Sequence, residues 1–353
     1  MYYSDPQIEK LYRIFDQNSR KGYLRLDLNE NPGGLPENFI RKVLAEAATP
    51  EFVAQYPETA HFQEILAHYL GTDPARLCLV NGSAEGIRYI IQAFTAPGGR
   101  IVGVTPSYFM FQVYTEMYGR ELVQIPYQDN LSMDVDDILA AMTKATQLLI
   151  LLNPNNPMGN VYTDAEFEQI LKVAREKEIT MLIDEAYHYF YPKTFIRYAL
   201  EQDHIFVTRT FSKLCSMAGC RLGYVAGWPD GIKLVQKLCT PHNTNAFALL
   251  FAEKILTCPN MIDDLIKKFT AGRQYLINEL DAHGYRHQGE AGNFLFIQPK
   301  TNAKDVVARM KENGILIKMY PSVGELGDCL RVSIGDVRCM QRFIMALLKI
   351  DRV

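Results

Sequence analysis

The sequence predicts an α/β fold: a large domain built on a mostly parallel, seven-stranded sheet between helices, followed by a smaller α+β domain. Between residues 77 and 227, short and continuously apolar segments alternate with helical patterns, which is typical of a parallel sheet buried on both faces. A long helical stretch without strands follows at about 246–281. Beyond it, strand and helix patterns alternate again over a length that fits only a small domain.

The seven strands expected in the large domain cover residues 77–81, 100–104, 121–125, 147–152, 179–184, 204–209 and 222–227. The helices expected between them cover 83–95, 107–118, 134–143 and 163–177, and Thr163 is the expected N-cap of the last. Helices at about 37–48 and 60–70 precede the first strand, and a short helix and an arm are expected within residues 1–25. Sheets of this kind bind ligands at the carboxyl ends of their strands.

The small domain is expected to contain strands at 293–298, 314–319 and 329–334, with helices at 302–313 and about 336–350. We therefore divide the chain into three parts. An N-terminal arm (1–30) packs with the small domain, a large domain (31–245) holds the ligand, and a linking helix and the small domain form residues 246–353.

Composition excludes several classes of function. The 353-residue chain is 48 % hydrophobic and 22 % charged, with a formal net charge of −3, so no nucleic-acid partner is expected. No apolar segment approaches the roughly 18 residues of a spanning helix, and the N-terminus lacks a signal-peptide pattern, so we expect a cytoplasmic protein without a membrane partner. The seven cysteines include no CxxC pair and the histidines no HExxH motif, so neither a metal site nor a disulfide framework is expected.

The stretch from Thr208 to Gly223 carries the strongest chemical signal. Lys213 follows Ser212 directly after an apolar strand, and Arg221 comes eight residues later. A lysine delivered from a strand end, beside hydroxyls and an arginine, suits an amine that works covalently next to a bound phosphate.

Other strand ends carry residues that fit the same ligand. Ser83 and Ala84 open a helix after a strand, which predicts either an anion site or an ordinary serine cap. Asp184 ends a buried strand, where its charge needs a cation, either an arginine or a protonated ring nitrogen. Asn156 lies in a rigid proline-containing loop, and Tyr108 could stack on a flat ring or pack in the core.

One ligand accounts for these residues together: pyridoxal 5′-phosphate. In this interpretation Thr210, Ser83, Ser212 and Arg221 hold its phosphate, Asp184 keeps its ring nitrogen protonated, Asn156 and Tyr187 face its phenolic oxygen, Tyr108 stacks on its ring, and Lys213 binds its aldehyde. Desolvation and the charge of Arg221 are expected to lower the pKa of Lys213, which must be neutral to move a proton.

The order of these motifs resembles the class I and II pyridoxal-phosphate-dependent aminotransferases of fold type I. The matching segments run from about residue 26 to 350 and read NENP, YP, NGSAEG, PSY, NPNNPMG, DEAY, SKLCSMAGCRLGY and LRVSIG. Within that family the chain is most similar to the histidinol-phosphate aminotransferase branch, which also includes threonine-phosphate decarboxylases.

The resemblance implies roles for individual residues. Lys213 forms the internal aldimine, and Lys213, Asp184 and Tyr187 are the catalytic set. The cofactor contacts implied are Ser83, Ala84, Tyr108, Asn156, Asp184, Tyr187, Thr210, Ser212, Lys213 and Arg221, with Tyr56 reaching the cofactor of a partner subunit. A homodimer with shared active sites follows. Arg331 would clamp the substrate α-carboxylate, and Asn29 and Glu30 fall in the arm that closes the site in relatives.

The substrate is predicted less closely than the cofactor. Lys318 stands where histidinol-phosphate enzymes have an arginine, Met158 stands where threonine is usual, and residues 17–34 lack the usual N-terminal motif. The expected reaction is ping-pong transfer of an amino group between an amino acid or amino-alcohol phosphate and a 2-oxo acid such as 2-oxoglutarate. Two alternatives stay open, a decarboxylase of the threonine-phosphate type and a regulator that only uses the fold.

Overall fold

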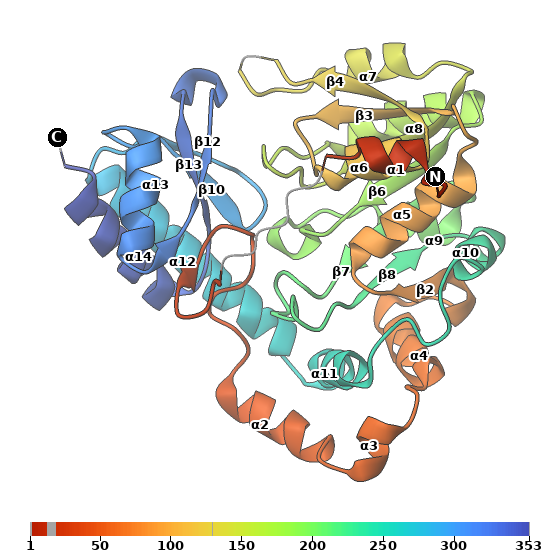
Figure 1. The fold of residues 1–353 in the computed structure, drawn as a ribbon, viewed down its shortest axis with the longest axis horizontal. Coiled ribbons are helices and arrows are strands. Elements are labelled where there is room, and N and C mark those ends of the chain that lie inside the picture. Colours follow the sequence, from red (N-terminus) through yellow and green to blue (C-terminus); the bar gives the residue numbers. More distant parts are fainter. Residues whose placement is uncertain (1, 13–18, 129, 353) are drawn as a thin grey trace.

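A seven-stranded sheet forms the centre of the large domain in the computed structural model, which describes residues 2–12, 19–128 and 130–352 (Figure 1). The strand order is β2-β8-β7-β6-β5-β3-β4. The strands are β2 (Leu77–Val80), β3 (Arg100–Thr105), β4 (Glu121–Pro126), β5 (Thr146–Leu152), β6 (Thr180–Asp184), β7 (Ile205–Thr210) and β8 (Gly223–Ala226). Within this sheet only β8 runs antiparallel to its neighbours, so the predicted sheet is confirmed.

Strand β5 shows why the central strands are apolar throughout. Leu148 and Ile150 pack into a core that includes residues of α5 (Ser83–Phe94), whereas Leu149 and Leu151 pack into a core that includes residues of α8 (Asp164–Glu176). Both faces are covered, so neither can be polar. The other helices of the large domain are α2 (Glu37–Glu46), α3 (Pro50–Ala54), α4 (Thr59–Leu70), α6 (Met110–Met117), α7 (Val135–Ala141), α9 (Ile196–Glu201) and α10 (Pro229–Gln236), with 3-10 turns η1 (Pro74–Arg76) and η2 (His188–Phe190).

Helix α8 begins at the predicted N-cap. The hydroxyl of Thr163 accepts a hydrogen bond from the backbone N–H of Glu166 at 3.2 Å, and the Glu166 carboxylate accepts one from the N–H of Thr163 at 2.7 Å. This reciprocal capping box satisfies two backbone donors that a helix start otherwise leaves without partners.

The linking segment consists of two helices, so the single helix predicted at 246–281 is wrong. Helix α11 (Ala246–Thr257) ends before Pro259, and α12 (Met261–Ala282) begins after it. Proline has no N–H to donate and disfavours a helical residue before it, and Asn260 has a left-handed φ of 62°. The chain turns here from α11, in the core of the large domain, to α12, which packs on the small domain.

The small domain contains an antiparallel sheet of order β12-β13-β10-β9. Its elements are β9 (His287–Gln288), β10 (Phe294–Ile297), α13 (Ala303–Glu312), β12 (Lys318–Tyr320), the 3-10 turn η3 (Gly324–Leu326), β13 (Cys329–Ser333) and α14 (Val337–Ile350). The strand predicted at 314–319 is divided. Its first part, β11 (Ile315–Leu316), pairs with β1 (Leu24–Arg25) of the arm, and only β12 pairs with β13.

The N-terminal arm divides between the two domains instead of packing entirely with the small one. Helix α1 (Pro6–Lys10) buries no side chain and lies beside α6 of the large domain (Figure 1). Further along, Leu24 and Leu26 are buried in the core of the small domain. Among the described residues of the arm, Leu24 and Leu26 therefore provide the alternating apolar side chains that anchor it there.

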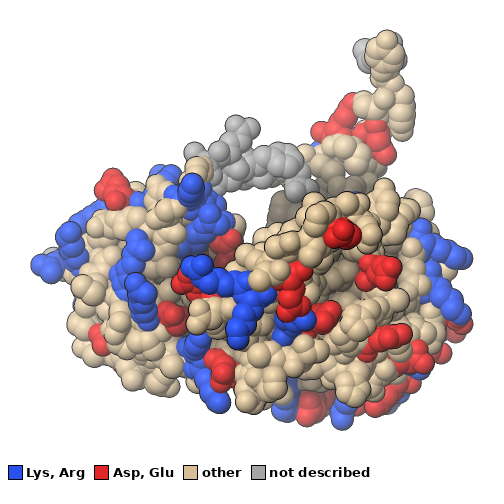
Figure 2. Space-filling view, turned by 90° about the horizontal axis from the view of Figure 1, so that it is seen from below, with Lys and Arg blue, Asp and Glu red and all other residues tan. Residues whose placement is uncertain are grey.

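The surface drawn in Figure 2 carries basic and acidic side chains interspersed over both domains. Among the described residues, every helix is too short or too polar to cross a bilayer.

The contact between α12 and the start of α14 yields a stability prediction. In a free helix, Gly→Ala is stabilising by about 1 kcal/mol, but a Cβ on Gly272 would overlap the carbonyl oxygen of Gly335. We therefore expect Gly272→Ala to lower the free energy of unfolding by about 1–3 kcal/mol, measured by urea denaturation.

Gly219→Ala is the matched control, because a Cβ there meets no atom within 4 Å. It should change the free energy of unfolding by less than about 0.5 kcal/mol. Equal stability of the two variants would show that α12 does not pack closely on residue 335.

Candidate active site

A cavity of about 400 Å³ opens at the carboxyl ends of the central strands, where the large domain faces β12 and β13 of the small domain. Its lining includes the side chains that the sequence analysis singled out, which come from both domains and the arm. These are Asn29, Ser83, Ala84, Tyr108, Asn156, Asp184, Tyr187, Thr210, Ser212, Lys213, Arg221, Lys318 and Arg331. Of the predicted site residues, Tyr56 lies elsewhere.

The carboxylate of Asp184 is buried at the end of β6 without a compensating ion pair among the described residues. Its side chain is 2 % exposed, and it accepts hydrogen bonds from the Thr208 hydroxyl at 3.0 Å and the Ala186 N–H at 3.2 Å. Burial raises its pKa to about 7, although these hydrogen bonds and the charge of Lys213 act in the opposite direction. The site therefore offers a negative charge that a cationic ligand would stabilise.

Lys213 follows β7, and its amine projects into the cavity. The Nζ atom donates a hydrogen bond to the Leu28 carbonyl at 3.2 Å and lies 5.5 Å from the centre of the Tyr187 ring. Burial lowers its pKa to about 8, and the positive charge of Arg331 contributes next. The expected depression is present; Arg221 contributes to it less than Arg331 does. A substantial fraction of the amine is therefore neutral near pH 8.

The first turn of α5 and the loop before β8 form a cradle of hydrogen-bond donors. Gly82 has a φ of 80°, and a side chain there would overlap the guanidinium of Arg221. Arg221 donates to the Ser212 hydroxyl at 3.3 Å, and the Thr210 hydroxyl donates to Ser212 at 2.9 Å. Ser83 and Ala84, which open α5, line the same cavity, and the first N–H groups of a helix have no partner within the helix. Such a helix start beside an arginine is suited to bind a phosphate.

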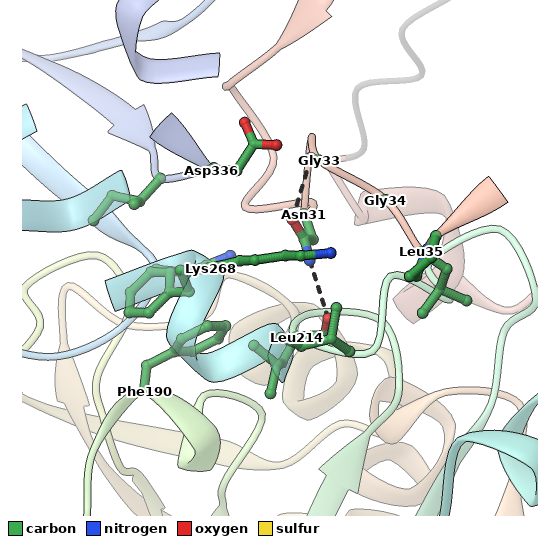
Figure 3. A pocket seen from close by; sticks show the side chains of 14 residues that line it. Asn31, Gly33, Gly34, Leu35, Phe190, Leu214, Lys268 and Asp336 are labelled. Atoms are coloured by element: carbon green, nitrogen blue, oxygen red, sulfur yellow. Dashed lines mark hydrogen bonds between the residues drawn. The ribbon is translucent and has the colours of Figure 1, made fainter. Parts of the chain in front are cut away.

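A second, smaller cavity of about 70 Å³ lies beside the loop that carries Lys213, residues 211–222, here called the lysine loop (Figure 3). There Asn31 donates a hydrogen bond to the carbonyl of Leu214, the residue after Lys213, at 3.1 Å. Lys268 of α12 and Asp336 of the small domain reach this cavity from other elements. Asn31, the first residue after the arm, thus supports the loop that carries Lys213.

Tyr187 is held from the arm. The Asn29 side chain donates a hydrogen bond to its hydroxyl at 3.0 Å. Asn29 is itself 1 % exposed, and its N–H donates to the Ser333 hydroxyl at 2.9 Å. In this structure Asn29 is therefore an anchored, buried residue that connects the arm to both domains.

Arg331 lies at the small-domain wall of the cavity. Its Nη1 donates to the side-chain oxygen of Asn156 at 2.9 Å and to the Tyr320 hydroxyl at 3.0 Å, and its Nη2 donates to the Asp27 carbonyl at 2.7 Å. The buried Nε of Arg331 has no hydrogen-bond partner within the described parts of the chain. Three of the five guanidinium N–H groups thus have partners within the described residues, and Asn156 contacts Arg331 as well as lining the cavity.

Lys318 pairs directly with Arg331 across β12 and β13. Burial lowers its pKa, and the adjacent positive charge of Arg331 lowers it further. Two neighbouring cations that share one cavity create a site for an anion.

Tyr108 and Tyr56 have different surroundings. Tyr108 lines the cavity, and its ring meets Phe111 edge-on at 5.6 Å. Tyr56 is 78 % exposed and stacks on His242 with the ring centres 4.4 Å apart. Within a single chain it does not contribute to the cavity.

Sequence reasoning missed Tyr320, which lines the cavity and bonds to Arg331. A signal was available, because Tyr320 and Lys318 are two residues apart in a strand and therefore share a face.

Glu185, beside Asp184, has a structural environment: it forms a buried ion pair with Arg209 at 2.7 Å and accepts a hydrogen bond from the Phe195 N–H at 2.6 Å. Asp184 and Glu185 thus face different surroundings.

The comparisons with known proteins identify the family. The model of aminotransferase class I and II matches residues 21–347. The chain belongs to this aminotransferase family. It is 32 % identical to histidinol-phosphate aminotransferase 1 of Burkholderia lata over 335 residues, which is 92 % of each chain, and 30 % identical to histidinol-phosphate aminotransferase of Thermoanaerobacter sp. over 342 residues, which is 96 % of each.

Solved structures place this aminotransferase in fold type I. Histidinol-phosphate aminotransferase from Sinorhizobium meliloti, in complex with pyridoxal-5′-phosphate, superposes with a TM-score of 0.86 at 24 % identity, covering 100 % of this chain and 98 % of the other. Aspartate aminotransferase from Thermus thermophilus with maleate superposes with a TM-score of 0.76 at 17 % identity, covering 98 % and 100 %. At these identities the likeness establishes the shared fold.

The cofactor of this aminotransferase family is pyridoxal 5′-phosphate, and the cavity fits it. A protonated pyridine nitrogen would supply the cation that the buried Asp184 lacks. The α5 start and Arg221 match a phosphate, and the amine of Lys213 is available to an aldehyde.

Asp184 yields a pH-dependent stability prediction for the cofactor-free protein. Its pKa is raised on folding, so the folded chain holds an extra proton between about pH 4 and 7, and stability falls as pH rises through that window. Asp184→Asn removes this dependence. We expect the variant to gain roughly 2 kcal/mol relative to the wild type between pH 5 and pH 8, measured by urea denaturation without cofactor.

With cofactor added, the same substitution should weaken binding, because the ring nitrogen loses its counter-charge. An Asp184→Asn stability that follows the wild type at both pH values would contradict the raised pKa. Asp164→Asn, at an exposed surface ion pair with Lys193, is the control.

Proposed function

We propose that this aminotransferase transfers an amino group between a donor that carries a phosphate or second carboxylate, of the histidinol-phosphate kind, and a 2-oxo acid such as 2-oxoglutarate. The observation that carries the proposal is the pair of cations, Arg331 and Lys318, in the same cavity as the amine of Lys213. The relatives named histidinol-phosphate aminotransferases support this choice of donor.

The two cations have no carboxylate partner of their own. Within the described residues, neither Arg331 nor Lys318 forms a salt bridge to an aspartate or glutamate side chain. Arginine binds planar anions through two N–H groups, whereas lysine acts as a point charge. Together they suit a phosphate dianion, and in the second half of a ping-pong reaction Arg331 would bind the α-carboxylate of the 2-oxo acid.

The residues around Asp184 would hold the cofactor. When bound, pyridoxal 5′-phosphate supplies an aldehyde that condenses with amines and a ring that withdraws electrons. We assign its phosphate to Ser83, Ala84, Thr210, Ser212 and Arg221, and its ring nitrogen to Asp184. We assign its phenolic oxygen to Asn156 and Tyr187, and one ring face to Tyr108. Lys213 is the residue to which we assign the covalent link.

Lys213 is also the proton carrier in this proposal. Its Nζ would take the proton from the substrate Cα as a general base and, as a general acid, would deliver it to the cofactor carbon. Burial and the charge of Arg331 favour the neutral amine that this step requires. The hydrogen bond to the Leu28 carbonyl fixes where the amine points.

We further propose a homodimer in which Tyr56 completes the partner's site. The side chain is large, aromatic and 78 % exposed, and its phenol is free of the cavity of its own chain. The stacking of His242 on its ring restricts the orientation of Tyr56.

Lys213→Ala should abolish transamination, because both the covalent link and the proton carrier are lost. The measurement is a screen of amino donors that includes histidinol phosphate, glutamate and aromatic amino acids. Conversion of the cofactor to its amine form is followed by absorbance.

Transamination by Lys213→Ala at near wild-type rate would refute the assignment. Release of carbon dioxide from a phosphorylated amino acid, without formation of a keto product, would favour the decarboxylase alternative.

The anion site is tested by Lys318→Met. Removing one charged partner of a phosphate typically costs about 1.5–3 kcal/mol, so KM for a phosphorylated donor should rise about tenfold to a hundredfold. A donor without a second anionic group should be affected little. Lys304→Met, at an exposed lysine of the same domain, is the control, and equal KM values for the two variants would place the anion elsewhere.

A further inference from the structure

Four consecutive residues of the arm, Asp27–Glu30, contact functional groups of both domains. The carbonyl of Asp27 accepts from Arg331 at 2.7 Å, and the carbonyl of Leu28 accepts from Lys213 Nζ at 3.2 Å. The Asn29 side chain donates to Tyr187 at 3.0 Å. The position of this short segment therefore determines the orientation of three assigned site residues.

Arg20 joins the two ends of this segment. Its Nη2 lies 2.5 Å from the Asp27 carboxylate and 2.8 Å from the Glu30 carboxylate, and its Nη1 donates to Glu30 at 3.3 Å. The three side chains are 18 %, 15 % and 25 % exposed, so solvent screens these contacts less than it screens a surface ion pair. One planar guanidinium thus holds both ends of this four-residue segment, and its Nη1 adds a second contact to Glu30 that a single ammonium nitrogen would lack.

We propose that Arg20 is a positioning residue of the active site: by clamping Asp27 and Glu30 it holds the backbone carbonyls that orient Arg331 and Lys213. The inference rests on the proposed function, since it gives Lys213 and Arg331 their roles. It adds Arg20, a residue of the N-terminal arm that does not itself line the cavity.

Arg20 also controls the charge next to the lysine. The groups whose charges act on Lys213 are the cations Arg331, Arg221 and Lys318 and the carboxylates of Glu30 and Asp184. In the wild type, Arg20 neutralises Glu30. Without Arg20 the Glu30 carboxylate keeps the more distant Arg25, whose Nη1 lies 3.7 Å away. Its negative charge is then less compensated and favours the ammonium form of Lys213, so less of the amine is neutral at a given pH.

The test compares Arg20→Gln with Arg41→Gln, which breaks an exposed ion pair on α2. For Arg20→Gln we expect kcat/KM for the amino donor to fall about tenfold and the acidic limb of its pH profile to move up by about one pH unit. Arg41→Gln should match the wild type in both respects.

Two further variants separate positioning from simple stability. In Arg20→Gln/Glu30→Gln the negative charge of Glu30 is removed as well, so the acidic limb should return toward its wild-type position. Arg20→Lys keeps the charge but loses the second nitrogen that binds Glu30, so its pH profile should stay near wild type while kcat/KM falls severalfold. Should Arg20→Gln fail to fold, Glu30→Gln alone carries the test, because it should move the limb in the opposite direction, to lower pH.

A second readout does not depend on catalysis. Acylation of Lys213 in the full-length, cofactor-free chain, followed across pH by peptide mass spectrometry, should show the same displacement for Arg20→Gln. Superimposable labelling and pH profiles for Arg20→Gln and Arg41→Gln, with only thermal stability changed, would overturn the proposal. If no donor in the screen is transaminated, the proposed function fails, while the labelling experiment still judges the clamp.

Discussion

The constraint on which the site depends is the buried carboxylate of Asp184, which forms no ion pair with another described residue. The sheet places Asp184 at the end of β6, in register with Leu152 of β5 and Thr208 of β7, so its position is set by backbone hydrogen bonds on both sides. The neighbouring strand leads directly to Lys213. Because Asp184 lies at the centre of the sheet, its distance from the lysine loop and from the α5 start is determined by the most rigid part of the molecule.

Burial in the cavity shifts the pKa values of Asp184 and Lys213 in opposite directions. The pKa of Asp184 rises and that of Lys213 falls, so each resists the charged form that it has in water. A ligand that brings a cation to one and an electrophile to the other relieves both. The site is therefore less stable empty than filled, and selectivity for a planar, charged aldehyde follows from electrostatics as well as from shape.

The sequence was sufficient for features that are local to strand ends and insufficient for features that depend on distant segments. Lys213 and Asp184 could be found because one follows an apolar strand and the other ends one, and Arg221 because it comes eight residues after Lys213. The turn at Pro259 was overlooked because apolar periodicity continues on both sides of the proline. Contacts such as Asn29 with Ser333, which are 304 residues apart, have no local pattern, and neither does the clamp at Arg20. The short helices α9 and α10 lack the length that makes a helical period recognisable.

Strand β8, the one antiparallel strand of the seven-stranded sheet, affects how such an enzyme can change. Because β8 runs opposite to β7, its first residue, Gly223, pairs with Thr210 and Val80, the last residues of β7 and β2. The connection from β7 to β8 is therefore a hairpin, with Lys213 and Arg221 in one loop. The groups assigned to the aldehyde and the phosphate thus belong to one body, whereas Lys318 and Arg331 belong to another. Mutations in the small domain can alter donor preference while leaving the chemistry of the hairpin intact.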